Sequence, residues 1–508
     1  MPAQRPNILF VMADQLAPQY LRAYGHRATK TPTIDALADS GVTFEGCYTN
    51  APLCAPSRYV MMTGRLPTRI GAWDNACELS SEVPTFAHYL SAAGYRTALA
   101  GKMHFCGPDQ THGYRERLTT DVYPSDFTWT PNWDDPAKPL DWYHTMDVVK
   151  NAGPCLRSSN IDYDDEVTFQ STRWLYDRAR NKADEGPFCL TVSYINPHDP
   201  YIARPEYWDL YRDDEIDMPK LGLGDVEPDP FSRRLMNAIG MDRPAPTEAQ
   251  IRAARRAYYA STSYVDAQLA KLLKALDEGG LRDNTLVLFT ADHGDMLGER
   301  GLWYKMHFYE WALRVPLIAW APARWGARRI AAPVSLLDIA PTLVELAGGL
   351  AEPALTWDGR SLVQLIEGRE APLRPVLAEY TAEGALAPVL MVRDGDLKLI
   401  WSEADPPLLY DLAADPQERR NLAEAPAMAE ARVRLEAILR ASWDPPALRA
   451  QVLASQRARR FTWGAVMQGQ YTSWDYQPRV DASRQYMRNH LDLNEVEATR
   501  RFPRPGRA

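Results

Sequence analysis

Two pairs of metal-binding residue types stand directly after apolar runs that are far apart in the sequence. Asp14-Gln15 closes one run near the start, and Asp292-His293 closes another much later. Such runs are typical of buried parallel strands, whose carboxyl ends meet at one edge of a sheet. Three oxygen-bearing side chains and one imidazole suit a divalent cation such as Ca²⁺ or Mn²⁺ better than a thiolate zinc site. The alternative is that these residues only cap strands or satisfy a buried polar position.

A cysteine precedes a predicted helix between these two pairs. Cys54 follows the loop 50–53 and stands just before a helix predicted over 56–63. A helix N-terminus presents free N–H groups that attract an anion, which suits transfer of an anionic group. His198 also follows an apolar run and can reach the same sheet edge. Two alternatives stay open: a small buried thiol, and a Cys–His thiol hydrolase that would leave the metal-type cluster unexplained.

The composition limits the class of protein. A chain of 508 residues is too long for one core, so two domains plus an appendage are expected. A net charge of −9 without a Lys/Arg-rich tract argues against nucleic-acid binding. The 6 cysteines are irregularly spaced and form neither a disulfide framework nor a CxxC metal site. No signal peptide and no apolar run of membrane-spanning length is apparent, so we expect a soluble, cytoplasmic protein without a membrane partner.

The elements that position these residues alternate between strand and helix patterns. Strands are predicted at 7–13, 188–195, 285–291 and 315–320, and helices at 32–40, 85–93, 165–180, 248–278 and 338–347. This alternation predicts an α/β fold with a central, mostly parallel sheet covered by helices on both faces. The span 200–246, rich in Pro and Asp, is predicted to be a long loop and part of a lid.

The spacing of apolar residues changes from about residue 376. Short apolar runs at 389–393, 397–401 and 408–412 predict a small antiparallel sheet, and a helix is predicted at 427–441. Residues 446–508 are rich in Arg and aromatic residues with little periodicity, which predicts an extended arm. The predicted organisation is therefore an α/β domain over 1–375, a smaller α+β domain over 376–445, and an arm over 446–508.

Four segments, in this order, resemble the sulfatases of the alkaline phosphatase superfamily. They are Asp14-Gln15, Cys54-Ala55-Pro56-Ser57-Arg58, Gly101-Lys102-Met103-His104 and Asp292-His293-Gly294-Asp295. The resemblance implies a large α/β sandwich and conversion of Cys54 to formylglycine by a formylglycine-generating enzyme. It also implies one divalent metal, Ca²⁺ or Mn²⁺, held by Asp14, Gln15, Asp292, His293 and the modified Cys54. Gln15 and His293 replace an Asp and an Asn of many sulfatases, as in the phosphonate monoester hydrolase and choline-sulfatase branch.

The resemblance also implies a role for each remaining site residue. One hydroxyl of the formylglycine hydrate attacks sulfur, and the other later expels sulfate. Lys102 and Lys305 neutralise sulfate oxygens, Arg58 holds the formylglycine loop, and Asn75 donates a hydrogen bond to sulfate. His104 and His198 move protons, and we assign His198 to the leaving group.

Further segments resemble choline-sulfatases more than sulfatases in general. They are 107–114, 118–124, 196–201, 295–303 and 486–490. A quaternary ammonium has no hydrogen-bond donor and is recognised by aromatic faces and carboxylates. The positions that match choline contacts of the family are Trp129, His144, Glu383, Asp492 and Asn494.

This resemblance implies a small-molecule sulfate ester, choline-O-sulfate, as the substrate. The acid and amide at 492 and 494 are exchanged relative to the family, which could broaden specificity. In the family the arm packs between subunits, so a homo-oligomer, dimer or tetramer, is expected. The rival functions are a promiscuous aryl sulfatase, a phosphonate monoester or phosphodiester hydrolase on the same site, and a non-catalytic binding protein.

Overall fold

The computed structural model of the chain describes residues 5–469, apart from residues 124, 137–143, 181–185 and 350–355. Nine strands of the described chain form one sheet in the order β10-β2-β9-β8-β1-β6-β3-β4, with β11 beside β2. The strands are β1 (Asn7–Ala13), β2 (Val42–Tyr48), β3 (Arg96–Gly101), β4 (Glu116–Arg117), β6 (Phe188–Tyr194), β8 (Thr285–Ala291), β9 (Arg314–Trp320), β10 (Arg328–Ile330) and β11 (Val334–Ser335). Among these nine described strands only β9 runs antiparallel to its neighbours, so the predicted mostly parallel sheet is confirmed.

The register of the central strands brings their carboxyl ends to one edge. Ala13, the last residue of β1, lies opposite Tyr194 of β6 and Ala291 of β8. The three strands therefore end side by side, and the residues that follow them meet at this edge, as the sequence predicted.

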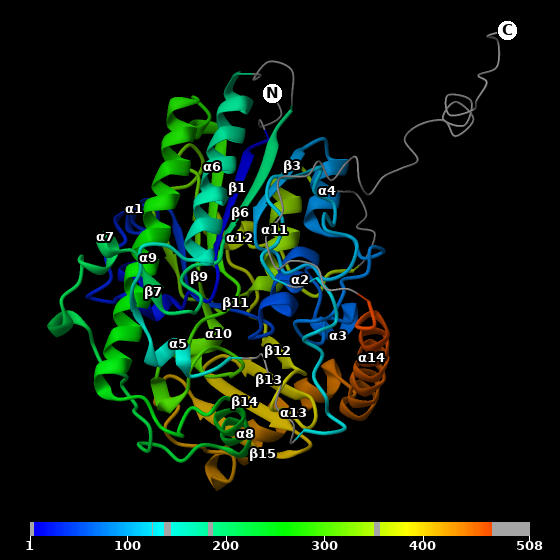
Figure 1. The fold of residues 1–508 in the computed structure, drawn as a ribbon. Helices are drawn as coiled ribbons and strands as arrows, with labels where there is room; N and C mark the ends of the chain where they lie inside the picture. Colours follow the sequence, from blue (N-terminus) through cyan, green and yellow to red (C-terminus); the bar gives the residue numbers. More distant parts are fainter. Residues whose placement is uncertain (1–4, 124, 137–143, 181–185, 350–355, 470–508) are drawn as a thin grey trace.

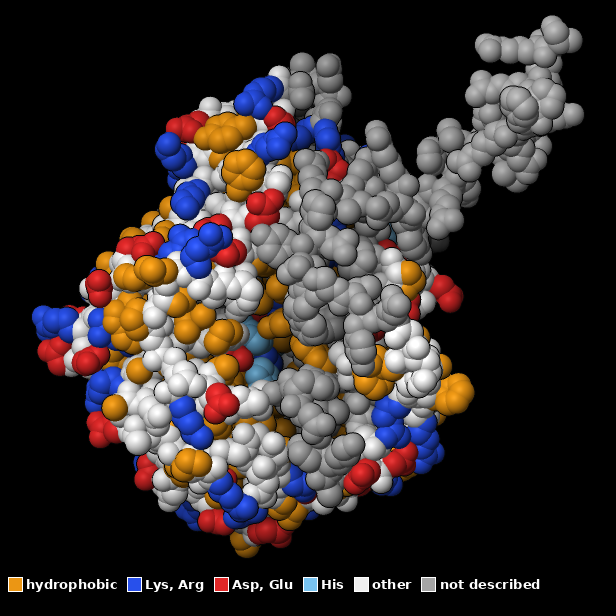
Figure 2. All heavy atoms as spheres, in the orientation of Figure 1, with side chains coloured by type: hydrophobic (Ala, Val, Ile, Leu, Met, Phe, Trp, Pro, Cys, Tyr) orange, Lys and Arg blue, Asp and Glu red, His pale blue; other side chains and the backbone are white. Residues whose placement is uncertain are grey.

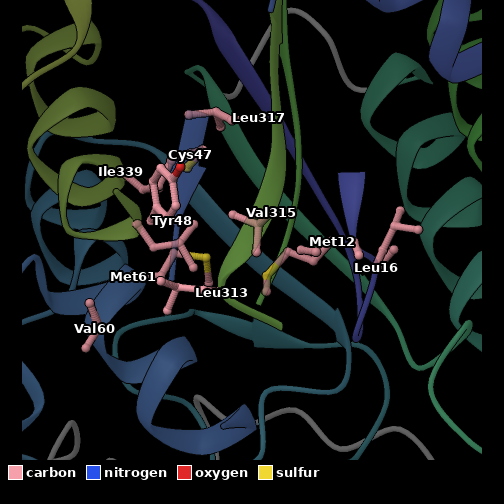
Figure 3. Packing of buried hydrophobic residues seen from close by; sticks show 14 of the residues in the cluster. Met12, Leu16, Cys47, Tyr48, Val60, Met61, Leu313, Val315, Leu317 and Ile339 are labelled. Carbon is pink, nitrogen blue, oxygen red and sulfur yellow. The ribbon is translucent and has the colours of Figure 1, made fainter. Parts of the chain in front are cut away.

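Helices cover both faces of the sheet (Figure 1). One group consists of α1 (Pro32–Ser40), α6 (Ser159–Arg180) and α9 (Glu248–Glu278), and the other of α2 (Cys54–Thr63), α4 (Phe86–Ala92) and α11 (Ile339–Leu346). These elements correspond to the helices predicted from the sequence. Figure 3 shows how Tyr48 of β2, Met61 of α2 and Ile339 of α11 pack together in the core. Burial of such side chains from water is the main force that holds α2 and α11 to the sheet.

The smaller domain contains the predicted antiparallel sheet, with one strand more than predicted. Its strands are β12 (Val376–Tyr380), β13 (Val389–Asp394), β14 (Leu397–Ser402) and β15 (Asp405–Asp411), in that order across the sheet. Helix α13 (Ala429–Ser442) packs on β13 and β14. Lys398 of β14 is buried and forms ion pairs with Glu310 and Glu418, which ties this sheet to the larger domain.

The prediction of an extended arm is wrong for its first part, which is helix α14 (Pro445–Val466). Asp444 caps the helix by accepting a hydrogen bond from the N–H of Ala447, and Pro445 occupies the first helical position. The helix buries one face, formed by Leu448, Val452, Gln456 and Arg459. Residues 470–508 of the predicted arm lie outside the described residues.

The span 200–246 is also more regular than the predicted loop. It contains α7 (Pro205–Trp208), α8 (Pro230–Ile239) and the short strand β7 (Ile202–Ala203), which pairs with β5 (Gly153–Pro154). Asp229 caps α8 by accepting hydrogen bonds from two backbone N–H groups, a start signal hidden among the acidic residues of this span. The remaining short helices are α3 (Pro67–Ile70), α5 (Asp147–Lys150), α10 (Glu310–Leu313) and α12 (Val363–Ile366). Within the described residues, no helix has the length and apolar character needed to cross a membrane.

Candidate active site

Four buried side chains form a cluster of metal-ligand type at the carboxyl edge of the sheet. Ligand atoms of Asp14, Cys54, Asp292 and His293 all lie within 4.8 Å of one another. The His293 Nδ1 lies 3.0 Å from the carbonyl oxygen of Gly294, so Nδ1 is the donor there and Nε2 is the nitrogen that faces the cluster. That Nε2 lies 3.2 Å from the Cys54 sulfur. Figure 2 shows histidine side chains in a hollow near the middle of the face drawn there.

Two cations lie against the carboxylates of this cluster. Arg58 Nε is 2.8 Å from Asp292 Oδ2, and Arg58 Nη2 is 3.2 Å from Asp14 Oδ2. The ammonium of Lys102 also contacts Asp14. Burial raises the pKa of Asp14, but the charges of Lys102 and Arg58 outweigh it and hold this pKa below its usual range. Two carboxylates and an imidazole nitrogen are a set of ligands that fits a hard or borderline divalent cation.

Gln15 lies beside the cluster, but its side chain is engaged elsewhere. Its backbone has a positive φ of 64°, and its N–H donates to Asp292 Oδ1 at 3.0 Å. The amide oxygen accepts a hydrogen bond from Lys305 Nζ at 2.8 Å, and Nε2 donates to Asp295 Oδ2 at 2.7 Å. Gln15 therefore orients Lys305 and Asp295 in this structure, and its role as a metal ligand stays a prediction.

The surroundings of Cys54 favour negative charge. Cys54 is the first residue of α2, which begins at position 54 and not at 56 as the sequence predicted, and it is 1% exposed. Burial raises the pKa of its thiol, but the positive charges of Lys102, Lys305 and His293 bring this pKa well below its ordinary value. The N–H of the next residue, Ala55, donates to Asn75 Oδ1 at 2.9 Å, which leaves Asn75 Nδ2 as a donor. The site is therefore built to accept an anion.

His198 and Lys305 form a second pair of polar groups next to the cluster. Lys305 Nζ lies 2.7 Å from His198 Nε2, and His198 Nδ1 lies 2.7 Å from the carbonyl oxygen of Asp199. The loop that carries His198 is held by the buried Asp164, which accepts hydrogen bonds from the N–H groups of Ile195 and Asn196. Sequence reasoning missed Asp164, because a single acid within the pattern of a long helix gives no local signal.

His104 and the aromatic residues around it form the next wall of the site. The N–H of His104 donates to Asp121 Oδ2 at 2.7 Å, and its φ is 58°. Its ring lies 5.1 Å from that of Tyr123 and 5.5 Å from that of Trp129, and the last two rings are 5.2 Å apart. Lys102 Nζ lies 4.1 Å from the centre of the Tyr123 ring. Tyr123 was not among the predicted site residues, although it belongs to the segment 118–124.

The other predicted substrate-contacting residues differ in their positions relative to this aromatic wall. His144 stacks on Tyr304 at 4.1 Å, its Nδ1 lies 3.4 Å from Asp199 Oδ2, and burial lowers its pKa to about 4. Glu383 lies on the turn after β12, where its carbonyl oxygen accepts a hydrogen bond from Tyr380 at 2.9 Å. Asp492 and Asn494 lie outside the described residues.

Comparison with protein families agrees with this geometry. The model of the family described as sulfatase matches residues 6–350, and that described as choline sulfatase enzyme C terminal matches residues 450–502. The C-terminal model of N-sulphoglucosamine sulphohydrolase matches residues 298–443.

Individual proteins give the same picture. The choline-sulfatase of Rhizobium meliloti is 44% identical over 99% of this chain and 100% of its own length. An arylsulfatase of Clostridium perfringens is 28% identical over 82% of this chain and 90% of its own. The solved phosphonate monoester hydrolase of Agrobacterium radiobacter has a TM-score of 0.68 at 24% identity, covering 88% of this chain and 96% of its own. A protein solved in complex with its substrate D-glucosamine-2-N,6-O-disulfate has a TM-score of 0.70 at 23% identity, covering 86% and 97%.

Proposed function

The chain belongs to the sulfatase family, and from this premise we propose that it hydrolyses choline-O-sulfate to choline and inorganic sulfate. The observation that carries the proposal is the full-length similarity to a choline-sulfatase. The site supports it, because an anion-binding cluster lies next to an aromatic wall.

The sulfate end of the substrate would lie at Cys54. We propose that a formylglycine-generating enzyme oxidises this cysteine, and that the hydrated aldehyde then supplies the hydroxyl nucleophile. A divalent cation, Ca²⁺ or Mn²⁺, held by Asp14, Asp292, His293 and the residue at 54 would polarise a sulfate oxygen and lower the pKa of that hydroxyl.

The remaining polar groups stabilise charge and move protons. The ammonium groups of Lys102 and Lys305 both lower the pKa of the Cys54 thiol. Charges that stabilise a negative sulfur at this position can also neutralise the sulfate oxygens. Asn75 Nδ2 adds a hydrogen bond. His198 Nε2 accepts a hydrogen bond from the Lys305 ammonium, so a proton passed from Lys305 to His198 could reach the leaving oxygen beside the sulfate group.

The choline end would lie against the aromatic wall. A trimethylammonium group gains about 0.5–2 kcal/mol from contact with an aromatic face, and tryptophan is the strongest such partner. Trp129 and Tyr123 supply two such faces beside Lys102 and His104. His144 is uncharged near neutral pH because its pKa is about 4, so it does not repel the cation.

Turnover of three substrates by one preparation tests the proposal. We expect kcat/KM for choline-O-sulfate to exceed that for a small aryl sulfate and for a phosphonate monoester by about tenfold or more. The phosphonate monoester is the second candidate, because a phosphonate monoester hydrolase shares the fold. A higher kcat/KM for the phosphonate or the aryl sulfate would contradict the assignment to choline-O-sulfate.

A further inference from the structure

Helix α14 places one buried arginine against the larger domain. Arg459 is 8% exposed, and its guanidinium makes a two-pronged ion pair with Asp74, with Nη1–Oδ1 and Nη2–Oδ2 distances of 2.6 and 2.7 Å. The same Nη1 donates to Thr130 Oγ1 at 3.2 Å. Figure 1 shows α14 at the edge of the molecule, away from the central sheet. None of these three residues was among the predicted site residues.

The Asp74 side of this contact leads to the sulfate half of the site. Asp74 Oδ1 accepts the N–H of Ala76 at 3.0 Å, so the carboxylate that binds Arg459 also shapes the turn on which Asn75 lies. Asn75 Oδ1 in turn holds the N–H of Ala55, directly after Cys54. A chain of contacts thus runs from α14 to the N-terminus of α2, where the sulfate group would bind.

The Thr130 side leads to the aromatic half. Thr130 Oγ1 donates to the carbonyl oxygen of Phe127 at 2.7 Å, which closes the turn that carries Trp129. One turn earlier on α14, Gln456 Oε1 accepts the N–H of Trp133 at 3.0 Å, so the helix holds this segment at a second point. The aromatic half therefore depends on the same face of α14.

The chemistry of this contact requires an arginine. A planar guanidinium can bind both carboxylate oxygens and a hydroxyl at once, whereas a lysine ammonium has a different shape and a shorter reach. Removal of the guanidinium would leave the fully buried Asp74 carboxylate without its cation.

We propose that Arg459 is a positioning residue that holds Asn75, at the sulfate end, and Trp129, at the choline end, in fixed relation to each other. The choline half of this inference rests on the proposed function. The sulfate half rests only on the proposed contact of Asn75 with sulfate, which any sulfate ester would share.

Two variants of Arg459 and a matched control test this role. Arg459→Met keeps the apolar stem, and we expect it to lower kcat/KM for a small aryl sulfate by about 10- to 100-fold, measured well below the melting temperature. Arg459→Lys restores a charge without the fork and should recover part of this loss. The control is Arg457→Met: Arg457 makes an equally two-pronged but exposed pair with Asp134, at 2.7 and 2.8 Å. This control should leave kcat/KM unchanged for both the aryl sulfate and choline-O-sulfate.

Thr130→Val separates the two halves, because it keeps the ion pair of Arg459 with Asp74. We expect KM for choline-O-sulfate to rise about 3- to 10-fold, with a smaller change for the aryl sulfate. If Arg459→Met does not fold, Arg459→Lys and Thr130→Val decide.

The proposal is overturned if the Arg459 variants keep the kcat/KM of Arg457→Met on both substrates, or if Thr130→Val changes both substrates equally. Failure of the proposed function has a different signature, since the wild type itself would then turn over the aryl sulfate but not choline-O-sulfate. In that event, loss of aryl sulfate turnover in Arg459→Met supports the sulfate half, and no loss overturns it.

Discussion

The positive charges around Cys54 decide what this residue can do. Lys102, Lys305 and His293 together outweigh the cost of burying negative charge at its sulfur. The other buried cysteines have no such surroundings: burial raises the pKa of Cys189, for example, to about 12. An inert buried thiol is therefore a poor description of Cys54.

The identity of the group at position 54 can be measured directly. Mass spectrometry of the peptide that contains Cys54 should find the aldehyde in active protein, and Cys54→Ala should lose about 10³-fold or more in turnover. The free energy of unfolding should fall by only about 1 kcal/mol. Cys189→Ala, also buried, is the control and should cost similar stability with full activity. A fully active sample with an unmodified thiol would rule out the formylglycine mechanism.

Removal of the metal should affect rate far more than stability. Arg58 bridges Asp14 and Asp292, so the two carboxylates do not face each other uncompensated. We expect dialysis against a chelator to abolish turnover, with recovery on addition of Ca²⁺ or Mn²⁺, and a small shift in melting temperature. Asp292→Asn should also abolish turnover, and it should cost about 1–3 kcal/mol, because an amide N–H₂ would then face a donor. Ordinary rates in metal-free protein would contradict the metal assignment.

At the scale of elements, the close approach of β3 and β6 determines where Lys102 lies. β3 ends at Gly101, whose φ is 102°, and the N–H of Lys102 donates to the carbonyl oxygen of Ser193 at 3.0 Å. A Cβ added at Gly101 would lie 1.9 Å from that oxygen. Backbone must therefore move if any other residue replaces this glycine.

Gly101→Ala should consequently displace Lys102 from the site. We expect kcat/KM to fall about 100-fold and the free energy of unfolding to fall by about 3 kcal/mol, since the strands must separate. Gly94→Ala controls for the positive φ alone, because φ is 85° there and a Cβ would meet nothing within 4 Å. This control should cost about 1 kcal/mol without loss of turnover. Equal behaviour of the two variants would show that the close approach is unimportant.

Strand β12 carries a buried acid that makes the fold sensitive to pH. Glu379 accepts hydrogen bonds from the N–H and hydroxyl of Thr68 and from Trp443 Nε1, so it joins three elements. Burial raises its pKa from 4.5 to about 7. The folded state thus binds the proton more tightly than the unfolded state does. The stability that comes from this proton is present below about pH 4.5 and is lost as pH rises through 7.

Chemical unfolding of Glu379→Gln at several pH values tests this dependence. The decrease in unfolding free energy between pH 4.5 and 8 should be smaller than in the wild type by about 3 kcal/mol. Glu367→Gln, at an exposed position, is the control and should follow the wild-type curve. Parallel curves for all three proteins would mean that Glu379 does not titrate in this range.

At the scale of the whole molecule, the chain beyond α14 is proposed to join subunits and to complete the choline pocket. Deletion of residues 480–508 keeps α14 and should lower the oligomer mass in sedimentation. It should also raise KM for choline-O-sulfate by about 5- to 150-fold, because a carboxylate near the cation would contribute ~1–3 kcal/mol. A small aryl sulfate should be affected much less. Equal impairment of both substrates with intact assembly would reduce this segment to a stability element.

The extent to which the sequence predicts this molecule depends on how strong each local signal is. The apolar runs that end at Ala13 and Ala291 identify β1 and β8, and parallel pairing then dictates that Asp14 and Asp292 meet. Strand β3 was missed, because its small residues give little hydrophobic contrast. Helix α14 was missed although Asp444 and Pro445 mark its start, because the polar residues Gln456 and Arg459 occupy core-facing positions and hide the apolar period.

Side-chain contacts across long sequence separations are beyond such reasoning. The pair of Arg459 with Asp74 joins residues 385 positions apart, and neither residue has a pattern that points to the other. The same holds for the amide of Gln15, whose engagement by Lys305 depends on the fold of a loop 290 residues away.

The burial of α2 determines whether Cys54 can be oxidised before or after the chain folds. All ten residues from Cys54 to Thr63 are buried, and Arg58 is locked between two carboxylates. A modifying enzyme has to bind this segment and reach the Cys54 sulfur, and in the folded protein both the segment and the sulfur are buried. If Cys54 is oxidised as proposed, the oxidation has to precede folding. In a chain that folds first, Cys54 stays an unmodified thiol. The active fraction of a preparation would then depend on the rate of Cys54 oxidation relative to the rate of folding during synthesis. Addition of the modifying enzyme to folded protein would not raise this fraction.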